Sequence, residues 1–179
     1  MSNFWGHLST ITRHRHKVML HCFKAGIFLQ GLRHDLSKYS LEEFLPGVKY
    51  YQGYRSPNES EREKNGCSRA WMHHKGRNKH HFEYWTDYSP AKRQMLPVKM
   101  PLKYVIEMFC DRVAASKIYG GDKYDDSYAL NYFLKGKATR AIHPETSELI
   151  EGLLTMLANE GEEKTFRYIR KLIKENKEY

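Results

Sequence analysis

Apolar residues recur at steps of three and four along much of the chain, which is the spacing of one face of an α-helix. The first such stripe predicts a helix over about residues 9–30, with Gly31 following it. The stripe consists of Ile11, His14, Val18, Cys22, Ala25 and Leu29. His14 therefore shares a helical face with apolar residues.

The same pattern predicts further helices. A second helix is expected from near His34 and Asp35 to past Phe44, ending before Pro46. Residues 53–66 are polar and charged and are typical of an exposed insertion, with one helical turn after Pro57. The remaining helices are predicted over residues 68–75, 102–119, 128–136, 144–161 and 162–177.

Residues 78–85 are expected to form a loop or a turn, and residues 86–99 an irregular segment that contains two prolines. No alternating run is long enough to predict a sheet. A chain of 179 residues is enough for one domain and too short for two of ordinary size. The patterns therefore predict an all-α fold, a helical bundle in one domain over residues 1–179.

Composition adds a charge imbalance. The formal net charge is +9, from 30 basic and 21 acidic residues, and the basic residues are spread along the chain. Such an excess favours an anionic partner, such as a phosphate-bearing metabolite or a nucleic acid, and is equally compatible with an ordinary solvated surface. The even spread does not favour nucleic acid, so a small phosphorylated substrate is the preferred partner.

The expected location is the cytoplasm. Three distant cysteines argue against a disulfide framework, and the first residues contain no apolar signal core. The longest apolar stretch, near residues 18–32, is interrupted by polar and charged side chains, so no membrane span is predicted. The oligomeric state is left open.

The ten histidines are unevenly distributed. Three lie on the first predicted helix, and four fall within residues 73–81, namely His73, His74, His80 and His81. Asp111 is an acidic residue on the apolar stripe of the 102–119 helix, where a carboxylate must be paired, hydrogen-bonded or bound to a metal. Imidazole and carboxylate ligands together suit borderline divalent metals, so these residues predict a metal site.

The order His14, His34-Asp35 and Asp111 resembles the H…HD…D order of the HD-domain metal-dependent phosphohydrolases. The stretch HDLSK, ending at Lys38, is similar to their HDxxK motif. Residues 100–116 resemble the late helix of the HD-GYP branch, which also places histidines before the last aspartate. The GYP signature is absent, because GRNKHH stands in its place, and this argues against cleavage of cyclic dinucleotides.

The whole chain also resembles an uncharacterised bacterial and phage family. Its members carry HDLSK, a block of two histidine pairs separated by five residues, and the same late aspartate. The wider HD resemblance covers about residues 10–118, which we expect to contain the metal-site core. The C-terminal helices, over about residues 126–177, lie outside it.

The HD resemblance implies a fold, a cofactor and a mechanism. It implies an HD-like bundle with one or two divalent ions, of Mn, Fe, Zn, Ni, Co or Mg, held by His14, His34, Asp35, Asp111 and members of the block His73, His74, His80 and His81. Asp35 would act as a catalytic bridging ligand. The metal would activate a water for attack on a phosphorus centre. Phosphoryl charge would be neutralised by Lys38, Arg77 or Lys79.

Several alternatives remain open at this point. His16 competes with His14 for the first ligand position, and one member of each histidine pair is expected to face the site. Glu43 could orient a ligand histidine. The predicted function is hydrolysis of a small phosphate ester or nucleotide. Its rivals are an HD-like di-iron oxygenase-type enzyme and a non-catalytic, metal-containing module that binds nucleic acid or protein.

Overall fold

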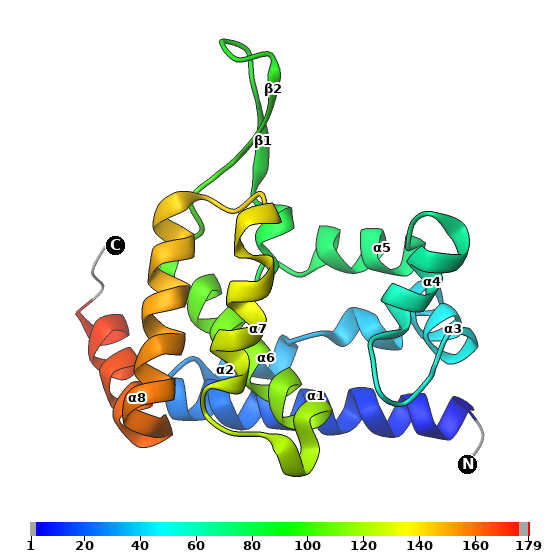
Figure 1. The fold of residues 1–179 in the computed structure, drawn as a ribbon, viewed down its shortest axis with the longest axis horizontal. Coiled ribbons are helices and arrows are strands. Elements are labelled where there is room, and N and C mark those ends of the chain that lie inside the picture. The colour runs from blue at the N-terminus through cyan, green and yellow to red at the C-terminus, as the bar shows by residue number, and fades with distance from the viewer. Residues whose placement is uncertain (1–2, 176–178) are drawn as a thin grey trace.

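Eight α-helices make up most of the part of the chain that the computed structural model describes, residues 3–175 and 179 (Figure 1). They are α1 (Asn3–Ala25), α2 (Phe28–Arg33), α3 (Leu41–Lys49), α4 (Pro57–Asn65), α5 (Arg69–Arg77), α6 (Leu102–Gly120), α7 (Tyr128–Gly136) and α8 (Pro144–Lys174). Short 3-10 turns occur at η1 (Leu36–Tyr39), η2 (Phe82–Tyr84), η3 (Gly121–Lys123) and η4 (Lys137–Thr139). The predicted all-α class is confirmed.

Helix α1 is the base of the molecule, and the other helices are arranged along it (Figure 1). Its buried face carries both apolar residues and three histidines, comprising Gly6, His7, Ile11, His14, Val18, His21, Cys22 and Ala25. Gly26 ends the helix with a φ of +86°, a left-handed conformation that glycine adopts without a steric penalty. One helix face thus serves an apolar core and a polar cluster at different points of its length.

The hydrophobic core lies where α1, α6, α7 and α8 pack together, and it is one continuous cluster. Helix α6 is its centre, since Val105, Ile106, Phe109, Cys110 and Val113 are all completely buried. Burial of side chains of this size is worth about 1.5–3 kcal/mol each. The core therefore fixes α6 against α1, and residues on the adjoining face of α6 acquire a fixed position.

Helices α3, α4 and α5 form the opposite end of the molecule from α7 and α8 (Figure 1). Ser68 caps α5 by accepting a hydrogen bond from the backbone N–H of Trp71. A hairpin of β1 (Thr86–Ser89) and β2 (Gln94–Pro97) extends away from the helices. The polar cluster lies between these two ends.

Several predicted boundaries are wrong. The first helix begins by Asn3 and ends at Ala25, so Leu29 belongs to the separate helix α2. His34 and Asp35 precede a 3-10 turn and do not begin a helix. The polar segment after Pro57 forms a nine-residue helix where one turn was expected.

Helix α3 continues through Pro46, where the sequence predicts an end. Proline costs the helix a hydrogen bond there, and the packing of α3 against α5 and α1 outweighs that loss. The predicted break at Gly161 is confirmed, because α8 bends at this residue with φ +79° and ψ 172°. The last two residues of the predicted 162–177 helix lie outside the described residues. No helix of the described residues is both long enough and apolar enough to span a bilayer.

Candidate metal centre

Four segments bring histidines and carboxylates together in the middle of the molecule. They are α1, the turn between α2 and η1, α5 with the residues after it, and α6. Three sets of potential ligands result, and two of them contain Asp35, while the third consists of His34, His80 and Glu107. The first set is His14, His34, Asp35 and Asp111, and the second is Asp35, His74, His80 and His81.

Asp35 occupies the left-handed region of the backbone, with φ 55° and ψ 25°. This conformation is uncommon outside glycine, and aspartate tolerates it better than most residues. It separates α2 from η1 and leaves the Asp35 side chain 1% exposed. Strained backbone of this kind clusters at functional sites.

The first set surrounds one oxygen of Asp35. Oδ2 of Asp35 lies 3.2 Å from Nε2 of His34 and 3.9 Å from Nε2 of His14. Oδ1 of Asp111 lies 2.9 Å from Nε2 of His14 and 3.6 Å from Nε2 of His34. Two imidazole nitrogens and two carboxylates therefore converge on one point.

The second set surrounds the other oxygen of Asp35. Oδ1 lies 3.3 Å from Nε2 of His74 and 3.5 Å from Nε2 of His80. The His81 ring packs against both, with centroid separations of 4.8 Å to His74 and 4.1 Å to His80. One carboxylate oxygen of Asp35 therefore faces each of these two sets.

Two glutamates contact the opposite nitrogen of the histidine rings. Oε1 of Glu107 lies 2.8 Å from Nδ1 of His34 and 3.2 Å from Nδ1 of His80. Oε2 of Glu43 lies 2.7 Å from Nδ1 of His74. A carboxylate that accepts the Nδ1–H of a ring fixes its tautomer and directs Nε2 toward a metal.

The inward-facing atoms have unusual surroundings for buried polar groups. Among the described residues, six buried side-chain atoms at this centre make no well-directed hydrogen bond: Nε2 of His14, His34, His80 and His81, and both oxygens of Asp35. Two of the six have an ion-pair contact, Oδ2 of Asp35 with Lys38 at 2.6 Å and Nε2 of His14 with Asp111 at 2.9 Å. A buried polar atom without a partner costs about 1–3 kcal/mol. The remaining atoms, Oδ1 of Asp35 and Nε2 of His34, His80 and His81, lie close together, so the donor set fits a divalent metal.

The electrostatics of the cluster agree with this reading. Burial opposes charge on His34, yet the Asp35, Asp111 and Glu107 carboxylates raise its pKa well above the usual range. Burial by itself would raise the pKa of Asp35, but the positive charges of His34, Lys38 and His74 hold this pKa well below the usual range. Without a metal, the ammonium of Lys38 and protons on His34 and His74 are what compensate the buried carboxylates.

The structure shows which of the competing histidines lie in the cluster. His14 lies in the cluster, whereas His16 is exposed on the other side of α1. Of the first histidine pair, His74 faces Asp35 while His73 lies outside both sets and contacts Glu43 at 2.7 Å. Both members of the second pair, His80 and His81, lie in the cluster.

The three candidate phosphate-binding residues differ in position. Nζ of Lys38 lies 2.6 Å from Oδ2 of Asp35. Arg77 and Lys79 are exposed, and in the described part of the chain no contact joins either of them to the cluster. Nζ of Lys79 instead lies 5.6 Å from the centre of the Tyr84 ring.

Sequence reasoning missed Glu107 altogether. This residue lies four positions before Asp111 on α6, so the two side chains share a helix face. A second acidic residue at that spacing on an apolar helix was the available signal. Glu107 is 5% exposed, and it contacts a histidine from each set.

Comparison with known proteins identifies a family whose function is unknown. The model of a family of unknown function, DUF5662, matches residues 3–156. No curated protein and no solved structure matches the chain. The matched residues include every member of both ligand sets. The chain belongs to the DUF5662 family.

Proposed function

We propose that this protein is a metal-dependent phosphohydrolase that acts on a small phosphate ester. The observation that carries the proposal is the position of Asp35, whose two oxygens face separate sets of imidazole Nε2 atoms. The order H…HD…D along the chain and the resemblance to HD-domain phosphohydrolases support the same reading. The net charge of +9 is consistent with an anionic substrate.

The proposed ligands divide as their geometry suggests. His14, His34 and Asp111 would hold one ion with Asp35, and His74, His80 and His81 would hold the other with Asp35. Divalent ions held in this way supply Lewis acidity and lower the pKa of a bound water, so that hydroxide is available near neutral pH. Glu107 and Glu43 orient the ligand rings by accepting their Nδ1–H groups.

Lys38 is the residue proposed to neutralise the phosphoryl group. Its ammonium contacts Asp35, and its side chain is 28% exposed. Burial opposes its charge, yet Asp35 and Asp111 raise its pKa, so the ammonium keeps its proton at neutral pH. A fixed cation beside the ligand carboxylate stabilises negative charge that develops on phosphoryl oxygens during transfer.

The proposal is tested by hydrolysis of p-nitrophenyl phosphate and a panel of phosphomonoesters with Mn²⁺, Fe²⁺, Co²⁺, Ni²⁺, Zn²⁺ and Mg²⁺. We expect activity that requires one of these metals and that falls at least about 100-fold in Lys38→Met. Asp35→Asn should abolish it. Lys171→Met, at an exposed lysine of α8, is the matched control and should retain full activity.

Two outcomes would replace the proposal by one of its rivals. Metal-dependent O₂ consumption with no phosphatase activity would favour the di-iron oxygenase. Salt-sensitive binding of nucleic acid by protein without any turnover would favour a binding module. Hydrolysis that survives Asp35→Asn unchanged would exclude this site as its source.

A further inference from the structure

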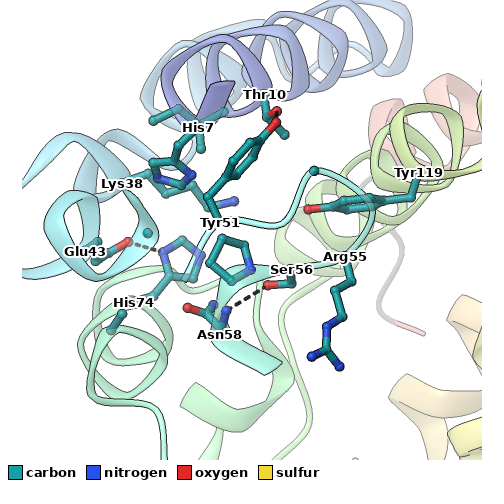
Figure 2. Close-up of a pocket in the computed structure, with 15 residues that line it drawn as sticks. His7, Thr10, Lys38, Glu43, Tyr51, Arg55, Ser56, Asn58, His74 and Tyr119 are labelled. Atoms are coloured by element: carbon teal, nitrogen blue, oxygen red, sulfur yellow. Dashed lines mark hydrogen bonds and ion pairs between the residues drawn. The ribbon is translucent and has the colours of Figure 1, made fainter. Parts of the chain in front are cut away.

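A pocket opens beside the metal centre, between α1, α3 and the N-terminal end of α4 (Figure 2). Two of its lining residues, Lys38 and His74, also contact Asp35, one at each carboxylate oxygen. A substrate whose phosphoryl group lies at Asp35 would therefore place its leaving group in this pocket. The cavity volume is about 70 Å³, several times the roughly 10–15 Å³ that a cavity needs to hold a single water.

The hydroxyl groups of the pocket are arranged to accept a hydrogen bond. The Thr10 hydroxyl donates to the carbonyl of Gly6 at 2.9 Å, so it has no further proton to offer. The Tyr51 hydroxyl lies 2.9 Å from the Thr10 oxygen and must donate to it. The phenolic oxygen of Tyr51 is left with free acceptor capacity, which suits a ligand hydroxyl better than a phosphate oxygen.

His7 supplies a second polar group to the same pocket. It is 6% exposed, and its Nδ1 atom has no hydrogen-bond partner among the described residues. Gly47 makes this position possible, because a Cβ atom there would collide with the His7 ring. In the same way Gly6 makes room for the ring of Tyr51. The His7 ring is therefore held by close packing against Gly47, and the Tyr51 ring by close packing against Gly6.

The far wall of the pocket does not suit a second anion. Arg55 forms a two-pronged ion pair with Glu63, with both contacts at 2.6 Å, and its guanidinium points away from Thr10, His7 and Lys38 in Figure 2. The Ser56 side chain already caps α4 by accepting from the backbone N–H of Asn58. What remains available is neutral hydrogen-bonding capacity.

We propose that this pocket binds the leaving group of the substrate, and that this group is a polyol or sugar of three to five carbons. The inference rests on the proposed phosphohydrolase function, and it specifies the class of phosphate ester. Tyr51 is its specificity-determining residue, because the Tyr51 oxygen accepts a hydroxyl proton of the substrate. An alkyl leaving group of the same size would leave the acceptor capacity of that oxygen unused and Nδ1 of His7 without a partner.

The test compares glycerol 3-phosphate with propyl phosphate, which has the same carbon chain and no free hydroxyl on it. We expect kcat/KM to be about 10-fold or more higher for glycerol 3-phosphate. Tyr51→Phe should reduce this preference to about 2-fold or less, with the loss mainly in KM. Tyr88→Phe, at an exposed tyrosine of β1, should leave the preference unchanged.

Calorimetric titration of the metal-free protein with the same two compounds, which it should not hydrolyse, tests the pocket independently of turnover. Tighter binding of glycerol 3-phosphate that is lost in a folded Tyr51→Phe variant supports the inference. Equal use and equal binding of the two compounds overturns it while p-nitrophenyl phosphate is still hydrolysed. Failure to hydrolyse any phosphate ester refutes the proposed function instead. In that case the binding comparison by itself shows whether the pocket prefers a polyol phosphate. Preference for a nucleotide over glycerol 3-phosphate would also overturn the inference.

Discussion

Oε1 of Glu107 lies 2.8 Å from Nδ1 of His34, and this contact directs Nε2 of the same ring toward Asp35. The same oxygen lies 3.2 Å from Nδ1 of His80. One buried carboxylate on α6 therefore orients a ligand from each of the two donor sets. The side chains that would hold metal are fixed by contacts behind them as well as by their own helices.

Loss of this carboxylate should weaken metal binding without unfolding the protein. We expect Glu107→Gln to raise the dissociation constant for Mn²⁺ or Zn²⁺ by about 10–100-fold, because the rings of His34 and His80 exchange a charged common acceptor for a neutral, weaker amide oxygen. Isothermal titration measures the change, and circular dichroism reports the helix content. Glu145→Gln, at an exposed ion pair with Lys99, is the matched control. A dissociation constant in Glu107→Gln equal to that of the wild type would contradict the orienting role.

The two donor sets should be separable by their ion stoichiometry. His14→Gln removes a ligand of the first set only, and His81→Gln removes a ligand of the second set only. Each variant is expected to bind one ion per chain where the wild type binds two, and Asp35→Asn is expected to weaken both sites. Elemental analysis after gel filtration gives the numbers. A stoichiometry of one in the wild type, lost in all three variants, would indicate a single shared ion.

The bend in α8 makes a stability prediction that does not involve the site. Gly161 has φ +79° and ψ 172°, a conformation almost confined to glycine, so Gly161→Ala should lower the free energy of unfolding by about 1–3 kcal/mol. Gly152 lies in the regular part of the same helix, with open space where a Cβ would be. Gly152→Ala should therefore raise stability by about 0.5–1 kcal/mol. Urea titrations of both variants test the opposite signs, and destabilisation by both would contradict the account.

His21 makes the fold sensitive to mild acid. Its Nδ1–H donates to the carbonyl of Cys110 at 3.2 Å, and its Nε2 lies 3.3 Å from Nζ of Lys117, which also forms an ion pair with Glu162. Burial and the charge of Lys117 lower the pKa of His21 to about 4 from 6.5. Between these values the unfolded chain binds a proton that the folded protein does not. The contribution of the neutral His21 ring to the free energy of unfolding is therefore complete above pH 6.5 and is lost as the pH falls toward 4.

The predicted consequence is a difference between the wild type and His21→Gln. In metal-free protein, the wild type should lose more free energy of unfolding between pH 7.5 and pH 4.5 than the variant does, by about 2 kcal/mol. Urea titration at several pH values measures both slopes. Other acid-sensitive groups affect both proteins alike and cancel in the comparison. Parallel pH dependences would show that His21 is not the responsible group.

The sequence predicted the helices best where the apolar stripes are long. The stripe of α1 and the buried face of α6 follow the period of a helix over many residues, and both helices were predicted. The hairpin of β1 and β2 was missed because its strands are four residues each and mostly exposed. No alternation of buried and exposed residues marks such strands, and their pairing depends on backbone hydrogen bonds.

The site was predictable in its ligand types and less so in its geometry. His34, Asp35 and Asp111 were singled out because a motif and an apolar stripe coincided. The left-handed backbone of Asp35 was not foreseen, since an Asp ahead of a polar segment is also a common helix start. The spacing of Glu107 to Asp111 was a usable signal for its burial, but its contact with His34 could not be assigned from local pattern, because His34 lies 73 positions away.

Anomalous scattering from a crystal of metal-loaded protein can locate the two ions that Asp35 is proposed to bridge. We expect two peaks at each Asp35, one within about 2.0–2.2 Å of the Nε2 atoms of His14 and His34, and one at the same distance from Nε2 of His74. Both peaks should also lie within ligand distance of the Asp35 carboxylate. A single peak that does not contact Asp35, or the absence of any peak between these residues, would contradict the proposed bridging role.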